Sequence, residues 1–171
     1  LPDKAVSEAR ERVRAALTTL GLALPAKKIT INLSPADMPK EGSHFDLPIA
    51  LALLAALSIV PPELVDSTVA LGELSLAGTL VPVIGALPAA LTASASDRKL
   101  MCPKECGPEA AWVGDTQVIA PDSLQAAMRH LIGDAVIAPS DPGEASPDSH
   151  VRDFADVKGQ SPAKRAMEIA A

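Results

Sequence analysis

Residues 27–54 read KKITINLSPADMPKEGSHFDLPIALALL, and the expected fold is built outward from this stretch. Its first part alternates polar with β-branched or apolar side chains at period two, which predicts a strand over 27–33 with one buried face. Proline and glycine crowd the part that follows and predict a loop over 34–45. The apolar run 47–60 is shorter than a bilayer requires and predicts a buried core helix.

The start of this predicted helix is the first candidate for a functional position. We expect Asp46 to cap the helix, and Pro48 falls in the first turn, where a missing N–H costs little. The loop therefore ends at the positive end of a buried helix. Such a position suits an anion or an activated side chain.

Upstream, residues 3–20 carry apolar side chains at three- and four-residue steps, which predicts an amphipathic helix. Asp3 is the expected cap and Gly21 the expected stop. The polar face carries several charges, and Glu8 precedes Arg12 at the spacing of a helical ion pair. We interpret this face as solvated, with contact to a partner or to DNA as the alternative.

Downstream, predicted strands and helices alternate, which indicates an α/β or α+β fold with helices on a mixed sheet. The first two strands are expected to form a hairpin through Ala77 and Gly78. The predicted strands are 69–76, 79–83, 100–102 and 117–120, and the predicted helices are 85–96, 104–112 and 122–132.

The composition limits the classes of function. With 171 residues, 48% of them hydrophobic, the chain can form one packed domain. Only 2% of residues are aromatic, which argues against a platform for stacking bases, and the net charge of -6 argues against nonspecific binding of a phosphate backbone by this chain alone. The N-terminal residues do not have the pattern of a signal peptide, so we expect a cytoplasmic protein with no membrane partner.

Cysteine and histidine do not form a zinc-binding pattern. Cys102 and Cys106 lie in one CPKEC segment, and the three histidines, His44, His130 and His150, are scattered. We therefore expect no metal site and interpret the two cysteines as reduced structural thiols.

The composition changes towards the C-terminus. Residues 139–152 are acidic and rich in Pro, Ser and Gly, and too few apolar residues follow position 138 for packing, which predicts a linker. Ser161 is the expected cap of a short helix over 162–171. The chain is thus expected to contain a domain over 1–138, a linker over 139–152 and the truncated beginning of a second domain over 153–171.

Three segments together resemble the magnesium-chelatase-like AAA+ ATPases. They are PKEG at 39–42 before the apolar helix, GELSLAG at 72–78 with VPV at 81–83 behind it, and the segment 153–160. In that family a Lon-protease-like domain of the ChlI type precedes the ATPase domain. The resemblance covers nearly the whole chain and is most specific over 27–54.

The resemblance implies a fold and a cofactor. Residues 1–138 would have the fold of ribosomal protein S5 domain 2, as in the Lon proteolytic domain, without the first strands of the family. The DVxGQ-type segment of such ATPases lies near the adenine and corresponds here to Asp156, Val157, Gly159 and Gln160. ATP and magnesium would bind only in the intact protein, since no Walker A sequence occurs in this chain.

The resemblance also implies a role. The chain would be a noncatalytic domain attached to an ATP-hydrolysing motor. By analogy with the family, the motor would form a homo-oligomeric, hexameric ring and drive branch migration on DNA in recombination or natural transformation. The alternative is an ATP-dependent serine protease of the Lon type.

The residues argue against the protease. A Lon-type dyad needs a serine activated by a lysine amine within hydrogen-bond reach. Alignment of PKEG on the Lon pattern puts His44 at the nucleophile position, with Ser43 one residue early as a weak candidate, and the segment 83–96 that should supply the lysine contains none. We interpret His44 as a loop or partner-contact residue. We expect Lys40, Glu41 and Asp46 to serve loop geometry, helix capping and local ion pairs. The alternative is contact with a neighbouring subunit or with nucleic acid.

Overall fold

A computed structural model of the chain describes residues 4–26, 28–34, 42–144 and 156–170. The short elements η1 and η2 are 3₁₀ helices. In chain order the elements are α1 (Lys4–Thr19), α2 (Asp46–Ala56), α3 (Pro62–Asp66), β1 (Thr68–Ala70), β2 (Glu73–Leu74), β3 (Leu80–Val81), α4 (Ala86–Ala95), β4 (Lys99–Met101), η1 (Lys104–Cys106), α5 (Gly107–Ala110), η2 (Ala111–Val113), β5 (Val118–Ile119), α6 (Leu124–Leu131) and α7 (Ser161–Ala170).

The main sheet has three parallel strands in the order β1-β4-β5. Parallel neighbours need a crossover connection, because the chain must return to the same end of the sheet. The β2–β3 hairpin and α4 make the return from β1 to β4, and η1, α5 and η2 make the return from β4 to β5. The mixed α/β class predicted from the sequence is confirmed.

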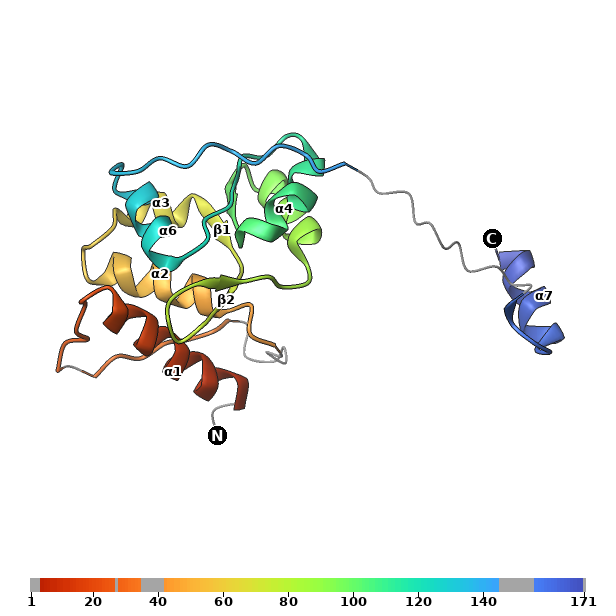
Figure 1. The fold of residues 1–171 in the computed structure, drawn as a ribbon, viewed down its shortest axis with the longest axis horizontal. Helices are drawn as coiled ribbons and strands as arrows, with labels where there is room; N and C mark the ends of the chain where they lie inside the picture. The colour runs from red at the N-terminus through yellow and green to blue at the C-terminus, as the bar shows by residue number, and fades with distance from the viewer. Residues whose placement is uncertain (1–3, 27, 35–41, 145–155, 171) are drawn as a thin grey trace.

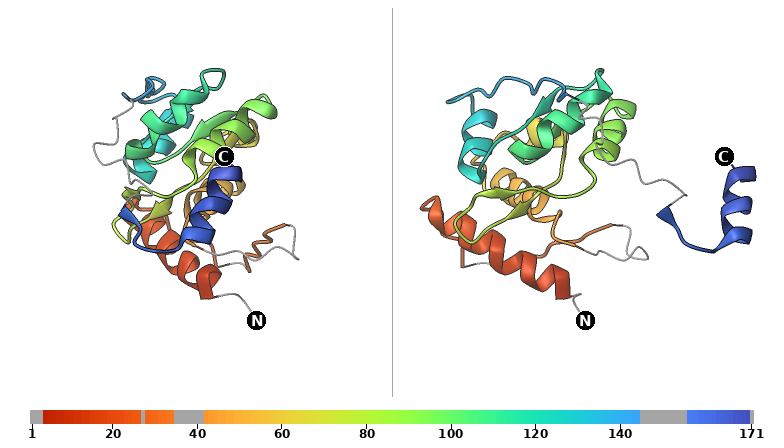
Figure 2. Two further views of the ribbon diagram at one scale, coloured as in Figure 1. Left: turned by 90° about the vertical axis from the view of Figure 1, so that its right-hand side faces the viewer. Right: turned by 45° about the vertical axis from the view of Figure 1, so that its right-hand side comes forward.

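Side chains on opposite faces of this sheet belong to two separate hydrophobic clusters. Leu100 and Val118 pack with buried residues of α4 and α5. Their neighbours Met101 and Ile119 pack instead with α1, α2 and α6. Figure 1 shows helices on both sides of the strands, and in Figure 2 α1 lies beside α2 and away from α4. A sheet covered on both faces explains why Leu100 and Met101 of β4 and both residues of β5 are apolar and buried, after the exposed Lys99.

The strand predicted over 69–76 is wrong in its extent, because it divides into β1 and β2 in two different sheets. The backbone between them bonds to the loop before α2: Gly72 N–H donates to His44 O (3.0 Å), and Leu47 N–H donates to Gly72 O (3.0 Å). A backbone engaged in this way cannot continue a strand ladder.

The predicted hairpin through Ala77 and Gly78 is confirmed, with shorter strands: β2 pairs antiparallel with β3, and Leu74 faces Leu80. Gly78 has a φ of 81°, and a Cβ there would lie 3.1 Å from Thr19 Oγ1. Glycine therefore serves both the turn and the close approach of α1.

The strand predicted over 27–33 is wrong for the part that the structure describes, since residues 28–33 have no strand assignment and pair with no other described segment. Ile29 and Ile31 remain 39% and 44% exposed. Alternating side chains indicate that a segment could pack as a strand with one buried face. A strand also needs a neighbouring strand that bonds to its backbone, and residues 28–33 have none among the described residues.

The core helix predicted within 47–60 is confirmed as α2, with Leu47, Leu51 and Leu54 fully or almost fully buried. The capping role expected of Asp46 is wrong. Phe45 occupies the N-cap position and makes no side-chain capping bond, while Asp46 is the first helical residue. Its carboxylate bonds to two other elements.

The remaining helix predictions hold in part. α1, α4, α6 and α7 lie within or close to the predicted ranges, and Ser123 caps α6 by accepting the Ala126 N–H. The helix predicted over 104–112 is instead three short turns, because Pro108 lacks a donor and restricts the residue before it. Among the described residues, no helix is long and apolar enough to cross a membrane.

The first part of the predicted linker is attached to the domain. Ser140 N–H donates to Val118 O (2.8 Å), and Gly143 N–H donates to Pro108 O (3.0 Å). Among the described residues of this predicted linker, 139–144, no side chain belongs to either hydrophobic cluster. Backbone hydrogen bonds hold these residues without such packing.

Candidate functional site

The loop that should carry a protease nucleophile lies against the turn between β1 and β2. The two backbone hydrogen bonds between the loop and Gly72 fix its end, and a third, from Asp46 N–H to Ser43 O (3.3 Å), closes the turn into α2. Lys40 and Glu41 lie outside the described residues. The candidate site therefore comprises residues 42–46 and the side chains that surround them.

Asp46 is the only buried polar or charged residue in the described part of the chain, with 0% of its surface exposed. Arg12 reaches it from α1 and donates two bonds, from Nε to Oδ2 (2.6 Å) and from Nη2 to Oδ1 (3.1 Å). Leu74 N–H, from β2, donates to the same Oδ2 (3.0 Å). Three donors from two elements compensate the desolvation of this carboxylate.

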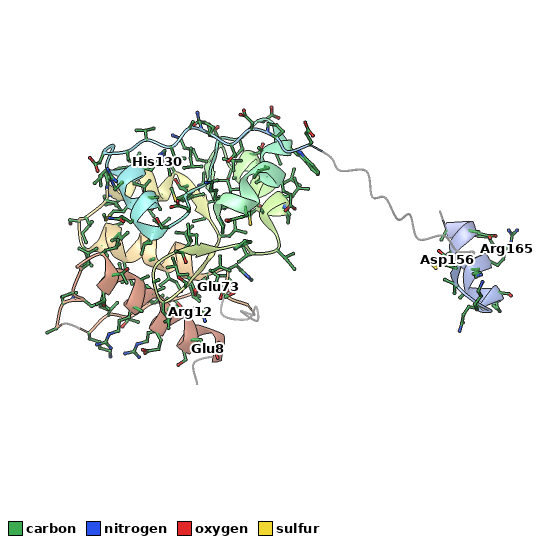
Figure 3. The ribbon with its side chains drawn as sticks, in the orientation of Figure 1. Glu8, Arg12, Glu73, His130, Asp156 and Arg165 are labelled. Carbon is green, nitrogen blue, oxygen red and sulfur yellow. The ribbon has the colours of Figure 1, made fainter. Side chains whose placement is uncertain are left out.

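The charges around Arg12 reinforce this pair. Glu8 lies one turn earlier on α1, with its Oε2 3.8 Å from Arg12 Nη1, as the spacing predicted. The pKa of Arg12 is raised, chiefly by its hydrogen bond to Asp46 and further by the negative charges of Asp46, Glu73 and Glu8, although burial opposes the rise. Figure 3 shows Glu8, Arg12 and Glu73 gathered beside one another on the molecule.

Among the described residues, Ser43 is held by an acid and not by an amine. Its hydroxyl donates a hydrogen bond to the carboxylate of Glu73. A carboxylate is a far weaker base than a lysine amine, so this contact orients the hydroxyl without supplying the base of a Ser–Lys dyad. The rings of His44 and Phe45 make a tilted contact, with centroids 4.3 Å apart and planes at 44°.

Sequence analysis therefore identified two residues of the site, Ser43 and Asp46, but not the side chains that bond to them. Ser43 and Asp46 come together with Arg12 and Glu73, from segments about 30 residues away on either side. Arg12 had one available signal, since it flanks the apolar stripe of α1 and so lies at the edge of the buried face. Glu73 gave none beyond its place in a predicted strand.

The residues expected near an adenine lie elsewhere. All four, Asp156, Val157, Gly159 and Gln160, are exposed in the segment that leads into α7. Gln160 O accepts the Lys164 N–H (3.0 Å) and so begins the helix. None of α7 is buried. By themselves these residues do not enclose a nucleotide.

An open groove of about 710 Å³ is lined by α1, by residues 24–26 and 28–31, and by Ile49 and Leu53 of α2. Its described lining is mainly apolar, with three cationic side chains, Arg10, Arg14 and Lys28, and no acidic one. Arg12, on the same helix, turns away from it to Asp46. The basic residues of α1 thus divide between an exposed groove and a buried ion pair.

Both cysteines are free and buried, as predicted. Burial raises the pKa of Cys102 to about 12 and also raises the pKa of Cys106, against the opposing effect of a hydrogen bond from Cys106 Sγ to Val83 O (3.5 Å). The thiolate is the reactive form, so these thiols are inert at neutral pH. No group of His, Cys, Asp and Glu suited to a metal ion occurs among the described residues.

The structure defines a mixed α/β domain in which a buried ion pair joins α1, α2 and β2. Residues 1–106 match the family described as subunit ChlI of Mg-chelatase. The whole chain is 42% identical to YifB of Escherichia coli strain K12 and 39% identical to the competence protein ComM of Haemophilus influenzae, and covers 34% and 35% of them, respectively.

The chain therefore belongs to the ChlI family. It corresponds to a ChlI-like domain of proteins of the YifB and ComM type, and it spans about a third of the length of these curated relatives.

Replacing Arg12 should show how much the buried pair stabilises the domain. Arg12→Met leaves the Asp46 carboxylate buried with one remaining donor, and we expect it to reduce the free energy of unfolding by about 3 kcal/mol. Urea titration followed by circular dichroism measures the change. Arg14→Met, on the exposed face of the same helix, is the control and should change stability by less than about 0.5 kcal/mol. Equal effects of the two substitutions would contradict the assignment.

The two thiols should react slowly with the thiol reagent DTNB at pH 8. At that pH a pKa of about 12 leaves about one Cys102 side chain in ten thousand as thiolate. We expect native labelling on the order of a hundredfold slower than labelling in urea. Ser96→Cys adds an exposed thiol as an internal control for reagent access. Native labelling of all thiols at the control's rate would show that Cys102 and Cys106 are accessible.

Proposed function

We propose that this chain is a noncatalytic, Lon-like domain of an ATP-hydrolysing motor that acts on DNA. The single observation that carries the noncatalytic part is the engagement of Ser43 by Glu73, beside the buried pair of Arg12 and Asp46. Each polar group at the place where Lon-type chemistry would occur, as far as the structure describes it, serves packing or orientation. The similarity to YifB and ComM supports attachment to a larger protein.

The finer fold and the domain boundaries are part of the same proposal. We assign residues 1–138 to a domain with the fold of ribosomal protein S5 domain 2, 139–152 to a linker and 153–171 to the beginning of an AAA+ ATPase domain. Support comes from the helices on both faces of the sheet and from the family match, which ends at residue 106. The exposed α7 is consistent with a helix that packs in a further unit.

ATP and magnesium would bind in the remainder of the protein. The chain lacks the loop that cradles phosphates, and the described residues 156–160 are all exposed, so they do not fit the cofactor alone. In the intact protein, Asp156, Val157, Gly159 and Gln160 would contribute one wall of an adenine pocket. ATP hydrolysis would supply the energy for movement on DNA.

The DNA substrate and the assembly rest on the relatives. ComM is named as a competence protein, which supports a role in natural transformation or recombination, with branch migration as the proposed activity of a hexameric ring. The net charge of -6 indicates that other parts of the protein provide most contacts to the phosphate backbone. Such a role places the protein in the cytoplasm.

A peptidase assay separates this proposal from the Lon-type alternative. The full-length protein, with ATP and magnesium, should release no fluorescence from labelled casein above the buffer rate, because among the described residues the Ser43 hydroxyl is engaged by a carboxylate and not by an amine. The matched variant is Ser43→Ala, which should give the same trace. Turnover that Ser43→Ala abolishes would establish a protease and refute the noncatalytic assignment.

A deletion tests the motor. Full-length protein and a version without residues 1–138 should hydrolyse ATP at similar rates, because we place no part of the phosphate site in the deleted region. Branch migration on a synthetic four-way junction, with the ring monitored by light scattering, then reports what the domain adds. Loss of ATP hydrolysis in a deleted protein that still forms rings would contradict a noncatalytic accessory role.

A further inference from the structure

After α6 the chain does not leave the domain but crosses it as an extended segment, residues 134–144. Its first contacts are the hydrogen bonds that Asp134 N–H and Ala135 N–H donate to Arg129 O (2.9 and 3.2 Å). Ile137 N–H then donates to His130 Nδ1 (3.0 Å), and Ser140 N–H donates to Val118 O of the outer strand β5. Figure 1 shows the segment running along the top of the domain from α6 towards α4.

The last described contacts of this segment converge on Gly143. Its N–H donates to Pro108 O (3.0 Å), and its carbonyl accepts the indole N–H of Trp112 (2.7 Å). Trp112 is 50% exposed and is the only tryptophan of the chain. The indole of Trp112 therefore holds the end of the segment through a hydrogen bond to the Gly143 carbonyl, and we call this contact the clasp.

The segment packs closely against the domain at Gly107. A Cβ on Gly107 would lie 2.4 Å from Ser140 Oγ and 2.7 Å from Ala120 Cβ. Gly107 has ordinary helical dihedral angles, φ -56° and ψ -50°, so the backbone does not require glycine. The space above Gly107 is occupied by the segment itself.

His130 accepts the Ile137 N–H only when Nδ1 carries no proton. Burial, and then the charge of Lys99, lower the pKa of His130 and favour this neutral form. The charges next to it on the same side, Arg129 and Asp134, pair with each other (2.6 Å). With the two backbone bonds to Arg129 O, the start of the segment has more hydrogen bonds to the domain than its end.

We propose that residues 134–144 form a releasable strap, clasped by Trp112, that sets how far the chain beyond residue 144 can reach from the domain. Pulling from the C-terminal side breaks the bonds at Gly143 first, then the bond at Ser140, then the bond at Ile137 and last the bonds of Ala135 and Asp134 to Arg129. Full release would lengthen the connection by roughly 35 Å, at about 3.3 Å per extended residue. The inference rests on these contacts and does not depend on the activity of the motor.

Amide hydrogen exchange of the 171-residue chain tests the clasp. Trp112→Phe keeps an aromatic ring but removes the N–H donor. We expect the amides of Gly143 and Ser140 to exchange roughly fivefold faster in this variant. Two core amides of the sheet, Leu100 and Cys102, should stay within twofold of their original rates.

The control is Leu76→Ala, which removes an exposed apolar side chain at the distant hairpin and should leave all four amides unchanged. Unchanged rates at Gly143 and Ser140 in Trp112→Phe would overturn the proposal. Equal acceleration of all four amides would also overturn it, because the clasp would then not be separable from the fold. So would unprotected exchange at Gly143 and Ser140 in the original chain.

Spin labels test the reach. Cysteines introduced by Leu76→Cys and Ala163→Cys lie on the hairpin and on α7, and both positions are exposed. Adding Trp112→Phe with Ser140→Pro deletes two strap bonds, and the distribution of distances between the labels should extend to longer values. An unchanged distribution would refute the role of the strap in setting the reach.

Discussion

The buried pair of Arg12 and Asp46 connects the parts of this domain that lie far apart in the sequence. Asp46 begins α2, Arg12 extends from the middle of α1, and the backbone N–H of Leu74 completes the set from β2. A carboxylate with no exposed surface is stable only when strong donors surround it, so α1, α2 and the hairpin must keep one relative arrangement. Ser43 and Glu73 lie next to this pair and share the constraint.

The same constraint explains why the loop is poorly suited to catalysis. A nucleophilic hydroxyl needs a base that can take its proton, and the described side chains that bond to Ser43 and Asp46 are a carboxylate and a guanidinium. The carboxylate is too weak a base and the guanidinium is always protonated. The polar side chains at this end of α2 stabilise the junction of three elements.

Attachment of the strap follows a different principle. Residues 139–144 contain no apolar side chain apart from Pro139 and Pro142. Hydrogen bonds nevertheless join Ser140 and Gly143 to the domain, and the carbonyls of Val118 and Pro108 would otherwise need water as their partner. Amino-acid composition gives the apolar content of a segment, but it does not predict hydrogen bonds between its backbone and a distant part of the chain. The predicted linker therefore begins where the apolar content falls, and its described residues 139–144 are bonded to the domain.

Local properties of the sequence were enough for α1, α2, α4 and α6, because periodicity, proline in a first turn and a serine cap act within a few residues. They were also enough for the hairpin at Gly78 and for the buried thiols. Tertiary structure alone decided the partner of Asp46, the division of 69–76 between two sheets and the absence of a strand at 28–33 in the described residues. Each of these depends on which backbone or charged group arrives from a distant segment, and hydrogen bonds and ion pairs of that kind leave no pattern in the residues that receive them.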